Sequence, residues 1–250
     1  PPEASLPALD IPPVSKKHQK ILGKQPRDKS GLGTILRDFQ VLLETIGPEG
    51  VRVAGKTQQF TSETLETLNA RLTHPIAIDF KRPRQKSYPN IHGLYLILRS
   101  SGLGIVRNSK KFQRLVLNEP VLQVWNNLNA EEQYCTLLES WLIRGNPGII
   151  GEKTFPGGPW ILECRQFLKR IPKHGLDTIE QNSLNTIRFT VGLHGVALLR
   201  FFGLLSLEEF KPEQGKGWNA RMYRTAYGEA LFDVLWKLFW ANEDVFFFTM

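Results

Sequence analysis

Cysteine is scarce in this sequence, where Cys135 and Cys164 are the only two and lie far apart. They fit neither a CxxC metal pattern nor a secreted disulfide framework, so we expect a reducing, cytoplasmic setting and no bound metal. Long apolar runs are lacking too. The nearest candidate, "VALLRFFGLLSL", is shorter than the roughly 18 residues that a membrane span needs and contains Arg200. We therefore expect no signal peptide and no membrane partner.

Catalytic motifs are almost absent. There is no GxSxG or HExxH, and the five histidines are scattered. One stretch, "GVRVAGKT" at 50–57, matches the phosphate-loop pattern, with Asp79 as a candidate metal-binding residue. A phosphate loop follows a strand and leads directly into a helix, whereas "VRVA" itself alternates like a strand. We predict a non-enzyme without catalytic residues or cofactor, and keep a nucleotide-dependent enzyme using Lys56 and Thr57 as a third alternative.

Acidic residues are missing between Asp79 and Glu119, within a chain of net charge +8. The same interval holds nine basic residues: Lys81, Arg82, Arg84, Lys86, Arg99, Arg107, Lys110, Lys111 and Arg114. This one-sided interval, more than the overall charge, indicates a polyanionic partner.

A short segment occurs twice. "IHGLYLILRSSGL" at 91–103 is repeated as "LHGVALLRFFGL" at 193–204, so that His92 matches His194 and Gly102 matches Gly203. Each copy reads as a helix, a Gly-Leu turn, a strand, a turn and a second strand. The second copy has almost no polar face, and we expect it to pack against the first copy or against the rest of a longer protein.

The remaining periodicity predicts a mainly α fold with small β hairpins (α+β). The predicted helices cover about 32–46, 63–72, 90–100, 119–127, 130–143, 159–170, 177–202 and 226–240. A further hairpin is expected in "VRVAGKTQQF". We predict an extended arm or linker at 1–30 and two winged-helix-like units at 31–150 and 151–250, separated within the Gly- and Pro-rich "RGNPGIIGEKTFPGGP".

The order of helix, hairpin and helix resembles the second half of a winged-helix domain. With the upstream hairpin, it is similar to the amino-terminal regions of the Ri-plasmid open-reading-frame-three-like proteins of prokaryotes, over roughly residues 32–240. This resemblance implies a regulatory, mobile-element, antiviral defence or transcription-related setting. Those proteins carry a further carboxy-terminal domain, and this chain begins at Pro1 and ends in the apolar "DVFFFTM". We therefore expect a piece of a longer protein.

The leading functional hypothesis is nucleic-acid binding, with DNA favoured over RNA. The turn at 107–111 would act as a basic wing, and His92, Tyr95 and Arg99 share a helix face that could approach a groove. The predicted nucleic-acid-binding residues are Lys81, Arg82, Arg84, Lys86, His92, Tyr95, Arg99, Arg107, Lys110, Lys111 and Arg114. If about four contact phosphate, the slope of log affinity against log salt is near −3.6.

The alternative is a protein–protein interaction scaffold. Winged helices also bind proteins, and the apolar second half suits docking to a partner. The charge favours nucleic acid, whereas the few polar side chains on both helices before the hairpins favour a scaffold, so both alternatives stay open.

Overall fold

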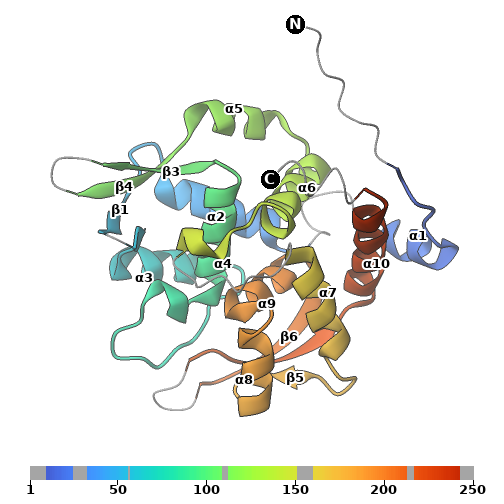
Figure 1. Ribbon diagram of the computed structural model, residues 1–250. Coiled ribbons are helices and arrows are strands. Elements are labelled where there is room, and N and C mark those ends of the chain that lie inside the picture. The colour runs from blue at the N-terminus through green and yellow to red at the C-terminus, as the bar shows by residue number, and fades with distance from the viewer. Residues whose placement is uncertain are drawn as a thin grey trace, which may run out of the picture.

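The computed structural model describes residues 10–24, 33–55, 57–108, 112–150, 160–212 and 217–242 (Figure 1). The fold is α+β, as predicted. Helices form most of the described chain, and the strands form two small antiparallel sheets, one in each half.

The first half contains a four-stranded sheet in the order β2-β1-β4-β3. Its elements are α2 (Ile35–Ile46), β1 (Val51–Ala54), β2 (Gln59–Phe60), α3 (Ser62–Arg71), α4 (Pro89–Ser100), β3 (Gly104–Asn108), β4 (Gln113–Leu117), α5 (Glu119–Asn127) and α6 (Ala130–Leu142), with 3-10 turns η1 (Gln85–Ser87) and η2 (Pro147–Ile150). The predicted helices and both hairpins of this half are confirmed. Within the phosphate-loop match, Val51–Ala54 form β1 and pair in the sheet, whereas Lys56 lies outside the described residues.

The second half contains a three-stranded sheet in the order β5-β7-β6. Its elements are α7 (Trp160–Arg170), β5 (Leu176–Asp177), α8 (Gln181–Arg188), α9 (Gly192–Phe201), β6 (Leu205–Phe210), β7 (Asn219–Arg224) and α10 (Ala226–Ala241). The prediction of one helix over 177–202 is wrong. β5 occupies its start, and Gly192 at φ +63° takes the left-handed conformation that separates α8 from α9.

The two halves share one order of elements and one pattern of strand pairing. Each runs helix, strand, helix, helix, hairpin, and in each the last strand of the hairpin pairs with the earlier strand. β1, β4 and β3 therefore correspond to β5, β7 and β6, and α4 corresponds to α9. The repeat in the sequence is a repeated structural unit.

The two equivalent helices pack against each other, as expected for the apolar second copy. The rings of His92 and His194 meet edge to face at 5.5 Å between centroids. Since these residues are equivalent in the repeat, the contact is of the self-complementary kind found at a two-fold axis. Gly93 permits the close approach, because a Cβ there would lie 2.8 Å from Leu198 Cγ and 3.1 Å from the His194 carbonyl oxygen.

The amino-terminal segment is only partly described, and its described part is not an extended arm. Lys16–Leu22 forms helix α1, which packs on α10. The backbone N–H of Asp10 donates to Asn242 Oδ1 at 2.7 Å, and the Asn242 side chain donates back to the Asp10 carbonyl at 2.8 Å. Composition did not predict this helix because it is short and its stability comes from contact with α10.

Replacing Gly93 by alanine tests the helix contact. An alanine normally stabilises a helix by about 0.5–1 kcal/mol over glycine. Here we expect Gly93→Ala to lower the free energy of unfolding by about 1–3 kcal/mol, because the methyl group overlaps Leu198. Urea denaturation measures the change. Gly55→Ala is the control, since a Cβ at Gly55 meets no atom within 4 Å. An unchanged or raised stability of Gly93→Ala would show that the helices can separate without loss.

Candidate nucleic-acid interface

The predicted basic residues fall into two groups that the fold keeps apart. Lys81, Arg82 and Arg84 are exposed on the connection between α3 and α4, which also carries Lys86. In Figure 1 this connection lies at the lower left, and the β3–β4 hairpin lies at the upper left. Phe80 lies against the β6–β7 hairpin of the second half, because a Cβ on Gly217 would come within 3.1 Å of its ring. The described basic residues of 81–114 therefore lie in two separate places.

The predicted groove-facing side of α4 is buried. His92 is 2% exposed and Tyr95 is 0% exposed, and every residue from Pro89 to Leu98 is buried. The prediction that His92, Tyr95 and Arg99 form an accessible face is wrong, because α9 and the surrounding elements cover α4. An α-helical spacing of 3 and 4 looks the same on a face turned to a partner helix as on one turned to solvent.

Arg99 has structural partners. Its guanidinium donates to Gln58 Oε1 at 3.1 Å and to Tyr95 Oη at 2.9 Å, and Tyr95 Oη donates to the Gln58 carbonyl. Burial raises the pKa of Tyr95, although the nearby Arg99 acts in the opposite direction. These bonds hold the β1–β2 turn, where Gln58 has φ +53°, against α4.

Three arginines form a row across the sheet of the first half. Arg114 on β4 lies directly opposite Arg52 on β1 and directly opposite Arg107 on β3. Residues that are directly opposite share a face of the sheet. Val53 and Leu115, which alternate with them, are buried, so the three arginines lie on the face turned away from the core. We call Arg52, Arg114 and Arg107 the arginine row.

The row is built around its central member. Arg114 donates through Nε to the Glu49 carbonyl at 3.0 Å and through Nη2 to the Gly50 carbonyl at 2.9 Å. The guanidinium carbons of Arg52 and Arg114 each lie 5.7 Å from the ring centroid of Phe112. Arg52 and Arg107 are exposed, and among the described residues no acid forms an ion pair with either.

The second half provides an internal comparison, because the central arginine of the equivalent row there is neutralised by an acid. Arg221 on β7 lies opposite Asp177 on β5 and Glu208 on β6. Its guanidinium donates to both Asp177 oxygens at 2.8 and 3.1 Å. The hydrogen bonds that Arg221 donates to Asp177 raise the pKa of Arg221 above its ordinary value. The same three positions thus read Asp-Arg-Glu in one sheet and Arg-Arg-Arg in the other.

Like charges directly opposite each other destabilise a sheet, whereas opposite charges contribute roughly 0.2–1 kcal/mol per pair. The Asp-Arg-Glu row shows that this scaffold accepts the stabilising arrangement. The arginine row has an arginine where the other row has an acid, at both flanking positions. This is the pattern expected of a surface whose charge is balanced by a negatively charged ligand.

Sequence reasoning named Arg107 and Arg114 but missed Arg52 and Phe112. Arg52 lies outside the acid-free interval, and only the pairing of β1 with β4 brings it to the row. The alternation in "VRVA" placed it on a strand face but could not tell which strand would lie beside it. Lys110 and Lys111, the predicted wing tip, lie outside the described residues.

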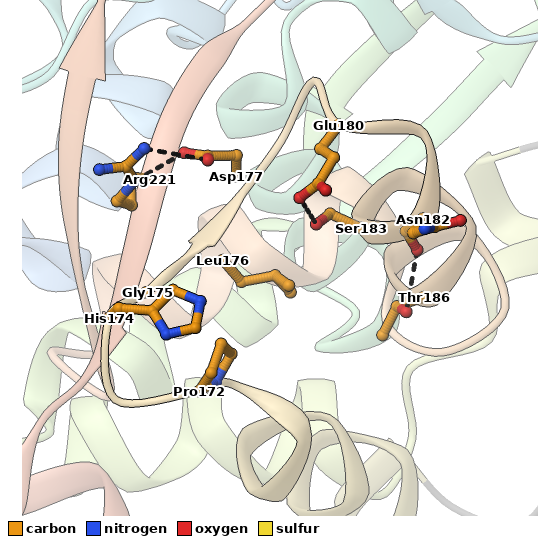
Figure 2. A pocket seen from close by; sticks show the side chains of 10 residues that line it. All are labelled: Pro172, His174, Gly175, Leu176, Asp177, Glu180, Asn182, Ser183, Thr186 and Arg221. Atoms are coloured by element: carbon orange, nitrogen blue, oxygen red, sulfur yellow. Dashed lines mark hydrogen bonds and ion pairs between the residues drawn. The ribbon is translucent and has the colours of Figure 1, made fainter.

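A cleft of about 390 Å³ lies in the second half, between the β5 region and α8 (Figure 2). Asp177 and Arg221 on one side form their ion pair, and Ser183 donates to Glu180 at 3.2 Å on the other. Figure 2 draws His174 beside Gly175 and apart from Ser183. The carboxylates are thus engaged with neighbours, and the described residues contain no cluster of three or more His, Cys, Asp or Glu suited to a metal ion. We assign no chemistry to this cleft.

Repulsion within the arginine row is expected to lower the free energy of unfolding, and this can be tested by substitution. Replacing Arg107 by the residue at the equivalent position of the second half, Arg107→Glu, places opposite charges across from Arg114. We expect the free energy of unfolding to rise by roughly 0.5–1 kcal/mol. For a chain of this size the melting temperature then rises by about 1–4 °C, and less at high salt. The converse change, Glu208→Arg, is expected to lower the melting temperature.

Thermal denaturation at low and high salt measures both variants. A lower melting temperature for Arg107→Glu at low salt would mean that Arg107 already has a compensating partner.

Among the described residues, no helix combines the length and apolarity that crossing a membrane requires. Comparison with known proteins gives no relative: no family model, no curated protein and no solved structure matches this chain. The function is therefore argued from the arginine row and its neutralised counterpart.

Proposed function

We propose that this chain is a non-enzymatic nucleic-acid-binding module that contacts the phosphate backbone through the arginine row. The observation that carries the proposal is the contrast between two equivalent sheet positions. One holds Arg221 between Asp177, its ion-pair partner, and Glu208, and the other holds Arg52, Arg114 and Arg107, none of which has an acidic partner among the described residues.

The chemistry of the row suits phosphate. Guanidinium groups stay charged at any physiological pH and present planar sets of donors that match phosphate oxygens. Residues opposite each other on antiparallel strands have Cα atoms about 4.5–5.5 Å apart, so three strands place the arginines over a span of about 10 Å. A backbone lying across the strands could contact more than one of them. Three phosphate contacts predict a slope of log affinity against log salt of about −2.7 for duplex DNA and about −2.1 for a single strand.

The order of elements supports a winged-helix interpretation of each half, in which β3 and β4 form the wing of the first unit. The helix before the wing normally enters a DNA groove, but α4 is occupied by its contact with α9. We therefore assign nucleic-acid contact to the sheet face and wing alone. The sequence resemblance favours a regulatory or defence role in a prokaryotic cytoplasm.

A protein–protein interaction scaffold stays the second candidate. Helix α9 of the apolar second copy packs on α4 within the same chain, so its apolar surface is used there. A docking role would need another surface of the second half, and nothing in the described residues identifies the partner that such a surface would fit.

Charge reversal at the two exposed row positions tests the proposal. Arg52→Glu/Arg107→Glu is compared with wild type by fluorescence anisotropy, using mixed-sequence DNA oligonucleotides, single-stranded and duplex, over a salt series. We expect the affinity at low salt to fall roughly 10- to 100-fold and the salt slope to shrink by about 2, since two phosphate contacts are lost.

Lys169→Glu/Lys173→Glu is the matched control, because both lysines are exposed in the second half and the change in net charge is the same. The control is expected to change affinity only slightly. Equal losses of affinity in the two variants would mean that binding depends on the net charge of the protein and not on the arginine row. Absence of binding by wild type at low salt would reject the proposed function.

A further inference from the structure

Phe112 gives the arginine row an aromatic member. It lies two residues before Arg114 and directly before β4, so its side chain belongs to the same outward face. Its ring is half-buried, with the guanidinium carbons of Arg52 and Arg114 each 5.7 Å from its centroid. The equivalent residue of the second sheet is Asn219, and the ring beside Arg221 there comes from Phe210 on the opposite strand. The two faces therefore differ in charge and in which strand carries the ring.

A partly exposed ring on an open sheet face suits a single-stranded nucleic acid better than a duplex. A duplex keeps its bases stacked inside, and a protein reads them by placing a helix or ribbon in a groove. The helix in the position to do this, α4, is buried from Pro89 to Leu98. Single strands, in contrast, expose base faces that stack on aromatic side chains displayed on open sheets beside basic residues. The arginine row with Phe112 is a surface of the second kind.

Resting on the function proposed above, we infer that the arginine row binds a single-stranded nucleic acid and that Phe112 stacks on one of its bases. Arg114 is fixed by its bonds to the Glu49 and Gly50 carbonyls, so it supplies a stationary positive charge beside the ring. Arg52 and Arg107 flank it with exposed guanidiniums for phosphates. A phosphate on Arg52 would bring its own nucleotide within reach of the Phe112 ring, which is adjacent to that guanidinium.

The experiment separates stacking from charge. Fluorescence anisotropy is measured with three DNA ligands of equal phosphate number: a mixed-sequence single strand, the same strand with abasic sites, and a duplex. Phe112→Leu keeps an apolar side chain but removes the ring. We expect it to weaken binding of the normal single strand roughly 5- to 100-fold, as one lost stacking contact does. Its affinity for the abasic strand should match that of wild type.

Phe210→Leu is the matched control. Phe210 also lies beside an arginine, with its ring centroid 6.0 Å from the guanidinium carbon of Arg221, but in the neutralised sheet. We expect it to leave all three affinities unchanged. Wild type should bind the normal single strand more tightly than the duplex or the abasic strand.

Two results would overturn the inference and leave the arginine row in place as a phosphate contact. One is a duplex bound as tightly as the single strand, and the other is a Phe112→Leu variant that binds the normal single strand like wild type. If Phe112→Leu loses the same factor on the abasic strand, the ring acts by positioning the arginines and stacking is rejected. Absence of binding to every ligand by wild type would reject the proposed function itself.

Discussion

The packing of α4 on α9 is the contact on which the rest of the structure depends. Both helices are apolar over nearly their whole circumference, and neither could face water without exposing a row of aliphatic side chains. Gly93 lets the helices come close, and His92 meets its repeat partner His194 at the centre. Because this contact buries the central helix of each unit, a ligand must bind elsewhere, and the outer faces of the two sheets are among the surfaces that remain exposed.

The repeated unit provides two equivalent outer sheet faces in one chain, and the two differ in charge. Arg221 has acids on both sides, and its ion pair with Asp177 adds to the stability of the sheet. Around Arg114 the flanking arginines repel one another, and Phe112 accompanies them. The second sheet shows that the fold can place opposite charges on adjacent strands, which stabilises it. Binding sites commonly lack such stabilising choices because function requires other residues, and we expect the same of the arginine row.

The sequence predicted local structure well because its signals are local. Gly47-Pro48 ends α2, Gly102 at φ +76° follows α4, and the Asn129–Glu132 capping box begins α6. The candidate site was predicted only in part, because it depends on contacts between distant segments. Nothing local reports that α9 covers α4 or that β1 lies beside β4, so His92 and Tyr95 were placed outside and Arg52 was missed. α1 and β5 are too short to show a period.

The most direct test of the central claim is the melting temperature of the protein with and without an excess of single-stranded DNA at low salt. A ligand that binds only the folded state raises the melting temperature. The account predicts a rise for wild type and little or none for Arg52→Glu/Arg107→Glu, although the variant alone should melt no lower than wild type. An equal rise in both proteins, or a variant that melts well below wild type without ligand, would contradict the assignment of the arginine row as the binding surface.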